Sequence, residues 1–125
     1  RSGLIIPDEN VFWYTTETKE KLFDDPEEVL KRLGDNTAVV CYNDEVAFGL
    51  VKCLLSAGRR IPEDVAVVSF DNSNLSRISQ VPITSLSYED RNIGRIAAQK
   101  LVDILNGREV SSEVLPWTFI QKESS

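Results

Sequence analysis

Polar side chains suited to hydroxyl groups follow three of the strands that the sequence predicts. Asn43, Asp71 and Tyr88 each come shortly after the end of an apolar run of strand length. In an open parallel sheet, ligands bind at the carboxyl ends of the strands. An Asp carboxylate accepts two O–H bonds, whereas an Asn amide both donates and accepts hydrogen bonds. This set of side chains therefore predicts a site for a polyol or a sugar.

Two adjacent aromatic residues, Trp13 and Tyr14, could supply the apolar ring face on which the C–H groups of a sugar stack. They lie in a segment, residues 11–15, whose β-branched and aromatic residues predict a strand. Because neighbouring side chains on a strand point to opposite faces, at most one of the two lines a cleft. For either residue alone, packing in the core is the favoured interpretation.

Asn43 and Asp71 have a second interpretation, in which each caps the element that follows it. Asn and Asp side chains commonly accept hydrogen bonds from the backbone N–H groups of a turn or a first helical turn. The capping role and the ligand-binding role have about equal weight here. The two roles are compatible, so both remain open for each residue.

The absence of histidine excludes much of the usual catalytic chemistry. Neither a Ser-His-Asp nor a Cys-His pair can form, nor a zinc site that contains histidine. Asp44 and Glu45 are adjacent at a predicted helix start, where acidic residues are favoured by the helix dipole, and they do not face each other. Glycine-rich phosphate motifs are also absent. We therefore predict no enzyme activity, no catalytic residues, no metal and no cofactor.

Length and charge narrow the class of protein further. The 125 residues are 42% hydrophobic and 27% charged, which is typical of one globular domain. The net charge of −6 disfavours binding to DNA and to anionic membranes by this part of the protein. Cys41 and Cys53 lack a C-x-x-C spacing, so two buried reduced thiols are favoured over a disulfide, which suits the cytoplasm. The start without methionine suggests a piece of a longer chain.

The predicted elements alternate between strand and helix. Residues 38–41 and 65–68 are continuous apolar runs, typical of parallel strands covered on both faces, and an amphipathic helix lies between them. A short helix between Asp25 and Gly34, a strand at 84–86, a long helix after the capping box of Ser87 and Asp90, and a final strand within 114–120 complete the pattern. The fold class is α/β, with a parallel sheet flanked by helices.

Three segments resemble the effector-binding domain of LacI/GalR-type transcription regulators. Residues 37–47 contain ND-x-x-A, residues 58–72 contain I-P-x-D-V-x-V-x-x-F-D, and residues 81–86 follow in the same order. The resemblance implies a periplasmic-binding-protein-like fold of type I, here partial and mostly one lobe over residues 1–125. It places the amino-terminal lobe and the DNA-binding head outside this chain. One departure is Asn72, which replaces the usual second acidic residue after Asp71.

The resemblance also implies roles for the candidate residues. Asn43 and Asp71 would bind a sugar effector in the cleft between the lobes, Trp13 and Tyr14 would stack on it, and Tyr88 would reach in from a crossover. The protein would be a homodimeric regulator, expected to be a repressor, that contacts DNA only through its head. The Tyr-Asn-Asp-Glu tetrad at 42–45 is most similar to the subgroup with GntR-type heads and arabinose as effector.

Two alternatives remain open: a solute-binding protein of a sugar transporter, and an α/β enzyme that uses Asp71 or Asp44. The resemblance further assigns the strand at 84–86 and the helix at 88–105 to the amino-terminal lobe. Without that lobe, the apolar stripe of the helix needs another partner. We expect either folding back onto the sheet or, preferably, a swapped dimer that uses the loop 71–82 as a hinge. The stripe consists of Ile93, Ile96, Ala97, Leu101 and Ile104.

Overall fold

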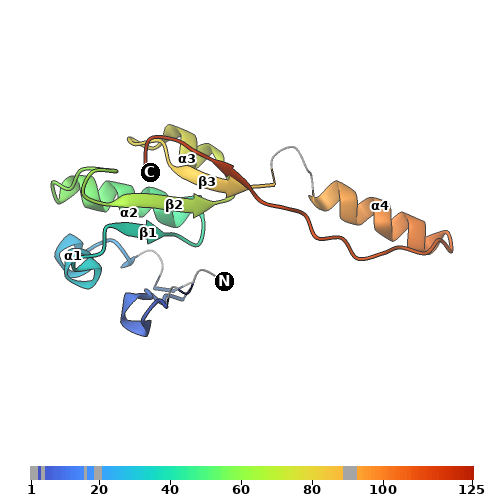
Figure 1. The fold of residues 1–125 in the computed structure, drawn as a ribbon, viewed down its shortest axis with the longest axis horizontal. Helices are drawn as coiled ribbons and strands as arrows, with labels where there is room; N and C mark the ends of the chain where they lie inside the picture. Colours follow the sequence, from blue (N-terminus) through green and yellow to red (C-terminus); the bar gives the residue numbers. More distant parts are fainter. Residues whose placement is uncertain (1–2, 4, 16, 19–20, 89–92) are drawn as a thin grey trace.

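The computed structural model describes residues 3, 5–15, 17–18, 21–88 and 93–125, which contain one sheet of four strands. The strand order is β1-β2-β3-β4 (Figure 1), and β1, β2 and β3 are parallel. The last strand, β4, is antiparallel to β3. The predicted α/β class is confirmed, but the sheet is mixed rather than wholly parallel. The strands are β1 (Ala38–Val40), β2 (Ala66–Phe70), β3 (Thr84–Ser87) and β4 (Thr118–Ile120).

Helices precede and follow the strands largely where the sequence predicts them. Asp25 accepts hydrogen bonds from the N–H groups of Glu27 and Glu28 and so begins the first α-helix. Asn43 accepts one from Val46 and begins the second. The helices are the 3-10 turn η1 (Asp8–Asn10), α1 (Pro26–Leu33), α2 (Asp44–Ser56), α3 (Asn74–Ile78) and α4 (Ile93–Leu105).

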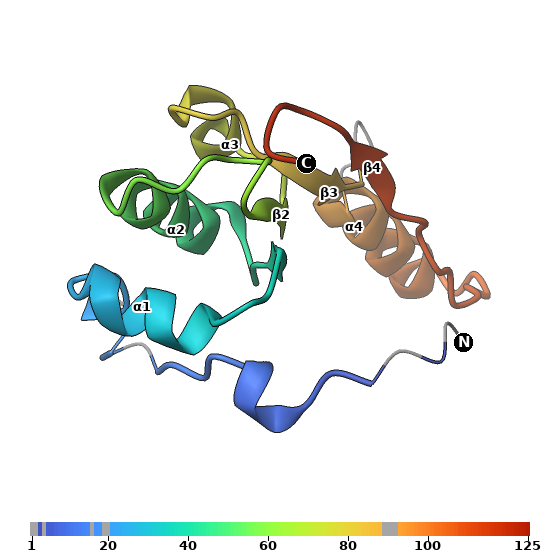
Figure 2. The ribbon, with the colours of Figure 1, turned by 60° about the vertical axis from the view of Figure 1, so that its left-hand side comes forward.

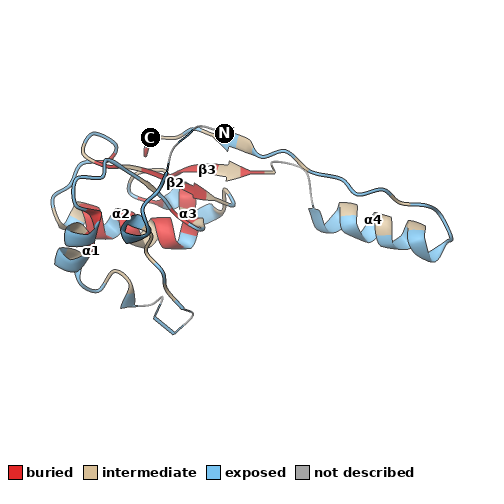
Figure 3. Ribbon diagram, turned by 60° about the horizontal axis from the view of Figure 1, so that its bottom comes forward, coloured by how far each residue is buried: buried red, intermediate tan, exposed pale blue. Residues whose placement is uncertain are grey.

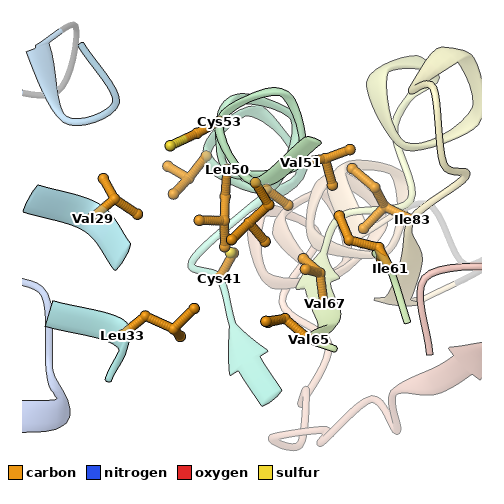
Figure 4. Close-up of a cluster of buried hydrophobic side chains, with 13 residues drawn as sticks. Val29, Leu33, Cys41, Leu50, Val51, Cys53, Ile61, Val65, Val67 and Ile83 are labelled. Carbon is orange, nitrogen blue, oxygen red and sulfur yellow. The ribbon is translucent and has the colours of Figure 1, made fainter. Parts of the chain in front are cut away.

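The hydrophobic core lies between α2 and the sheet. Val51 and Leu54 of α2 are fully buried, as are Val67 of β2 and Ile83 next to β3. Figure 4 shows the side chains of Val51, Val67 and Ile83 converging, with Val29 and Leu33 of α1 closing one side. The predicted β1–α2–β2 unit is therefore confirmed as the centre of the fold.

Only one face of the sheet is covered in the described part of the chain. Figure 2 shows α1, α2 and α3 on the same side of the sheet. On the opposite face, Val40 is 69% exposed and Phe119 is 55% exposed. The prediction that both faces are covered is thus wrong for these residues. An apolar run indicates a strand whose faces favour burial, but it does not show that another element packs on each face.

Residues 11–15, all of which the structure describes, form no strand. Phe12 lies under the Arg32 guanidinium at 4.4 Å, and Tyr14 packs against the core, while Trp13 is 83% exposed. The predicted strand is wrong because aromatic and β-branched residues here pack against α1 and the core instead of pairing with another strand.

The carboxyl-terminal half departs from the expected lobe assignment. Since β3 pairs with β2, the strand at 84–86 belongs to the same sheet as the core strands and not to another lobe. The expected hinge loop at 71–82 contains α3. The final strand lies within the predicted segment 114–120. It begins at Thr118, after Pro116, whose missing N–H cannot join the sheet ladder.

Helix α4 lies beyond the carboxyl end of β3, away from the other helices (Figure 1). None of its residues is buried, and Figure 3 shows it in the colours of exposed and intermediate residues. Folding back onto the sheet was one of the two expected outcomes, and α4 does not do so. The capping box proposed for its start includes Asp90, which lies outside the described residues.

Candidate functional site

The loop that follows β2 has an unusual backbone. Asp71 and Asn72 have φ angles of 99° and 50°, which lie in the left-handed region that non-glycine residues rarely adopt. The Asp71 N–H donates to the Leu86 carbonyl oxygen at 2.9 Å, and the Asn72 N–H donates to Ser85 Oγ at 3.0 Å. The loop is therefore fastened to β3 by its own backbone.

A cavity of about 300 Å³ opens beside this loop. Asp71 and Tyr88, both predicted site residues, line it together. The Asp71 residue is exposed, so its carboxylate is open to a ligand. The other lining residues are Ser87, Ile93 and Trp117.

Aromatic rings form one wall of this cavity. The rings of Tyr88 and Trp117 are stacked, with centroids 3.9 Å apart and an interplanar angle of 30°. Phe70 also contacts Trp117 edge to face, at 5.3 Å between centroids. A carboxylate beside an aromatic wall is the combination that a sugar requires, since its hydroxyls need acceptors and its C–H groups need an apolar surface.

None of the other three predicted site residues lines this cavity. Asn43 is half-buried and caps α2 through its bond to the Val46 N–H, 3.0 Å long. Trp13 is exposed, and Tyr14 packs on the core. The capping role of Asn43 is confirmed, while Asp71 is not a helix cap, because Ser73 caps α3. Ligand contacts of Asn43, Trp13 and Tyr14 stay predictions.

Sequence reasoning missed Trp117 as a site residue. It treated Trp117 only as part of a final strand, although the residue precedes that strand and stacks on the predicted site residue Tyr88. The available signal was an aromatic residue directly before the predicted final strand. The pairing itself joins residues distant in sequence, such as Ser87 with Thr118, and no local pattern indicates it.

Lys122, from the carboxyl-terminal segment, is hydrogen-bonded to the loop that follows β2. Its Nζ donates to Asn72 Oδ1 at 2.8 Å, to the Ile83 carbonyl oxygen at 2.8 Å and to Ser76 Oγ at 3.1 Å. Burial lowers the pKa of Lys122, and the negative charge of Asp44 opposes this shift.

A second cavity, of about 650 Å³, lies near this lysine and contains none of the predicted site residues. Its lining consists of Arg77, Pro82, Gln121, Lys122 and Glu123.

The remaining chemistry-bearing residues serve the core. Cys41 and Cys53 are free and buried, which confirms the prediction of two buried thiols over a disulfide. Burial raises the pKa of Cys41 to about 12. In the described residues, no group of three or more His, Cys, Asp or Glu side chains is placed to hold a metal ion. Within the same residues, no helix has the length and apolarity needed to cross a membrane.

Comparison with known proteins identifies a family. The model of the periplasmic binding protein-like domain matches residues 5–125. Among curated proteins, the HTH-type transcriptional repressor PurR of Vibrio vulnificus is 36% identical over 78 residues, which are 62% of this chain and 23% of the relative. The arabinose metabolism transcriptional repressor of Halalkalibacterium halodurans is 31% identical over 105 residues, or 82% of this chain and 28% of the relative. The chain thus spans about a quarter of the length of these relatives.

The fold is also similar to that of solved regulators. A transcriptional regulator CelR–cellobiose complex superposes with a TM-score of 0.77 and 31% sequence identity. The match covers 97% of this chain and 38% of the CelR chain. The similarity therefore includes β4 and α4 as well as the core.

Proposed function

Because this chain belongs to the periplasmic binding protein-like domain family, we propose that it forms part of the effector-binding domain of a sugar-responsive transcriptional repressor. The resemblance to LacI/GalR-type regulators, first indicated by the motifs at 43–47 and 61–71, is confirmed by the relatives described above. These relatives are transcriptional regulators, which favours a regulator over the solute-binding protein and the enzyme.

The cavity beside Asp71 carries the proposal. Asp71 follows β2 and Tyr88 follows β3, and both line one cavity with Trp117. The Asp71 carboxylate would accept hydrogen bonds from two sugar hydroxyls, while the Tyr88–Trp117 wall would pack against the C–H face of the ring. Asn43 would donate its amide N–H from the end of β1 without giving up its cap to α2, because the cap uses only the amide oxygen.

Effector binding would act on DNA indirectly. A sugar that binds one arrangement of the two lobes better than the other shifts the population toward that arrangement. In a homodimer this shift would change the placement of two DNA-binding heads, which would lie outside residues 1–125. Such a regulator would work in the cytoplasm, where reduced Cys41 and Cys53 are stable. The arabinose repressor that aligns with 82% of the chain supports arabinose as the effector.

Calorimetry of the complete protein tests this function. The panel contains L-arabinose, other pentoses, hexoses and cellobiose, and we expect micromolar or tighter binding of one sugar class. Asp71→Ala should weaken that binding by about 1.5 to 3 kcal/mol, because a charged acceptor in the site is lost. Asp35→Ala, which removes an exposed carboxylate outside the cavity lining, is the matched control and should keep wild-type affinity. Failure of the wild-type protein to bind any sugar in the panel would contradict the proposal.

A further inference from the structure

Asp44 is the one buried carboxylate in the described part of the chain, and its residue is 1% exposed. It occupies the first position of α2, directly after the cap residue Asn43. Three donors reach its two oxygens: the Ser69 hydroxyl, the Ser85 hydroxyl at 2.9 Å and the backbone N–H of Ser73. A buried carboxylate is tolerated only when it is hydrogen-bonded in this way. Its partners come from β2, β3 and the loop after β2.

Ser85 connects Asp44 to the loop through two hydrogen bonds of its hydroxyl group. Its Oγ donates to Asp44 Oδ1 and accepts the Asn72 N–H at 3.0 Å. A hydroxyl has one hydrogen, so donation to Asp44 leaves the lone pairs of Ser85 free to face Asn72. Ser69 differs in this respect, since its hydroxyl donates to the same carboxylate oxygen but has no bond to the loop backbone in the described structure.

The loop needs this support because its conformation is strained. Two successive non-glycine residues, Asp71 and Asn72, have positive φ angles. Such strained residues persist only where interactions with the surrounding structure hold them in place, and they are common at functional sites. Three successive backbone N–H groups are fixed here, those of Asp71, Asn72 and Ser73. Asp44 holds the third directly and the second through Ser85.

We propose that Ser85, oriented by the buried Asp44 carboxylate, is a positioning residue, which holds the strained backbone at Asn72 so that the Asp71 carboxylate faces the cavity. The consequence for sugar binding rests on the function proposed above, whereas the effect on the backbone does not. If the two serine hydroxyls served only to satisfy the buried Asp44 carboxylate, removal of Ser69 or of Ser85 would have the same effect on the loop.

Ser85→Ala and Ser69→Ala form a matched pair for the test. Each removes one hydroxyl that donates to Asp44 Oδ1, and each residue is fully buried on its strand. The measurement is amide hydrogen exchange at Asn72 in the complete protein without ligand. The reference is the Val67 amide, which is bonded to the Ser124 carbonyl oxygen in the core and reports any general loss of stability.

We expect Ser85→Ala to raise the Asn72 exchange rate, relative to Val67, by about tenfold, since one hydrogen bond is lost. Ser69→Ala should leave this ratio within about threefold of wild type. Equal ratios in the two variants, or an Asn72 amide that stays protected in Ser85→Ala, would overturn the proposal.

Titration with L-arabinose is the second readout. Ser85→Ala should bind it about tenfold more weakly than Ser69→Ala does, because only the first variant releases the loop that carries Asp71. A wild-type protein that does not bind L-arabinose contradicts arabinose as the effector and does not alter the exchange result. The exchange ratio therefore decides the positioning role separately from the proposed function.

Discussion

Asn43 uses its side-chain oxygen to cap α2, and this bond determines which substitutions can separate its two roles. Asn43→Ala should lower the free energy of unfolding by about 1 kcal/mol, because the Val46 N–H loses its acceptor. Asn43→Ser should stay within a few tenths of a kcal/mol, since serine caps equally well. Denaturant unfolding curves of both variants measure these changes.

If the Asn43 amide also contacts the effector, both variants should bind sugar more weakly, by about 1.5 to 3 kcal/mol, without unfolding of the domain. Calorimetry with the sugar that the wild type binds is the measurement. Wild-type affinity in both variants would mean that Asn43 is only a cap.

Cys41 makes stability depend on pH at the alkaline end. Its pKa is about 12 in the folded protein against 9.0 for an unperturbed thiol, so between pH 9 and pH 12 only the unfolded chain loses the proton. The stabilisation is present below pH 9 and is lost as pH rises toward 12. The Cys41 contribution to this loss is at most about 4 kcal/mol, at 1.36 kcal/mol for each pH unit.

Chemical denaturation from pH 8 to pH 12 in wild type and Cys41→Ala tests this dependence. The free energy of unfolding should fall less across this range in the variant than in wild type. The difference between the two proteins at pH 8 measures the cost of removing the buried Cys41 side chain. Lys122 acts in the opposite direction in both proteins, because its lowered pKa makes stability rise with pH. Parallel curves for the two proteins would contradict the Cys41 contribution.

At the scale of elements, Gly49 shows how closely the amino-terminal segment approaches α2. A Cβ added at Gly49 would lie 2.6 Å and 2.8 Å from two ring carbons of Phe23. Gly49→Ala should therefore destabilise the protein by about 1 to 3 kcal/mol through overpacking. This cost outweighs the gain of about 1 kcal/mol that alanine brings to a helix interior.

A double-mutant cycle isolates this contact. In a Phe23→Ala background the ring is gone, so Gly49→Ala should stabilise the protein by up to about 1 kcal/mol. Thermal unfolding of the four proteins gives the coupling free energy. The same loss of stability in both backgrounds would show that the glycine is needed for another reason.

At the scale of the whole molecule, α4 is the element without a partner among the described residues. Ile93, Leu101 and Ile104 are 47%, 57% and 57% exposed, and burial of each large apolar side chain contributes about 1.5 to 3 kcal/mol. We therefore expect this 125-residue chain by itself to associate through the stripe, as a swapped dimer. Light scattering measures the mass of the particle.

Leu101→Lys should shift this association toward the monomer, because a charge enters the apolar stripe. Gln99→Lys, an exposed position off the stripe, is the matched control and should leave the mass unchanged. A monodisperse wild-type monomer whose α4 amides resist hydrogen exchange would contradict the dimer.

The charge of the whole chain leads to a second prediction at this scale. With a net charge of −6, the 125 residues lack the clustered Lys and Arg that release counterions from DNA. This chain alone should show no salt-sensitive binding to an operator in a gel-shift or anisotropy assay. Binding as tight as that of a complete regulator would mean that the DNA-contacting residues are not in a separate head.

The sequence by itself determined the elements whose causes are local. Asp25 and Asn43 cap α1 and α2 through bonds to the next few residues, and apolar spacing predicted α2 and the strands beside it. The same reasoning gave Asp71 and Tyr88 as neighbours, because the carboxyl ends of parallel strands meet at one edge. It failed for residues 11–15, where composition alone could not distinguish a strand from an extended segment packed on α1.

Only the tertiary structure decided how the site is held. The Asp44 carboxylate meets Ser69, Ser73 and Ser85, which lie 25, 29 and 41 residues further along the chain. Trp117 reaches Tyr88 only because β4 turns back antiparallel to β3. Caps and helical spacing depend on residues within one or two turns of each other, so the local sequence is enough to predict them. Contacts between distant segments depend on how the whole chain packs, and no local pattern encodes them.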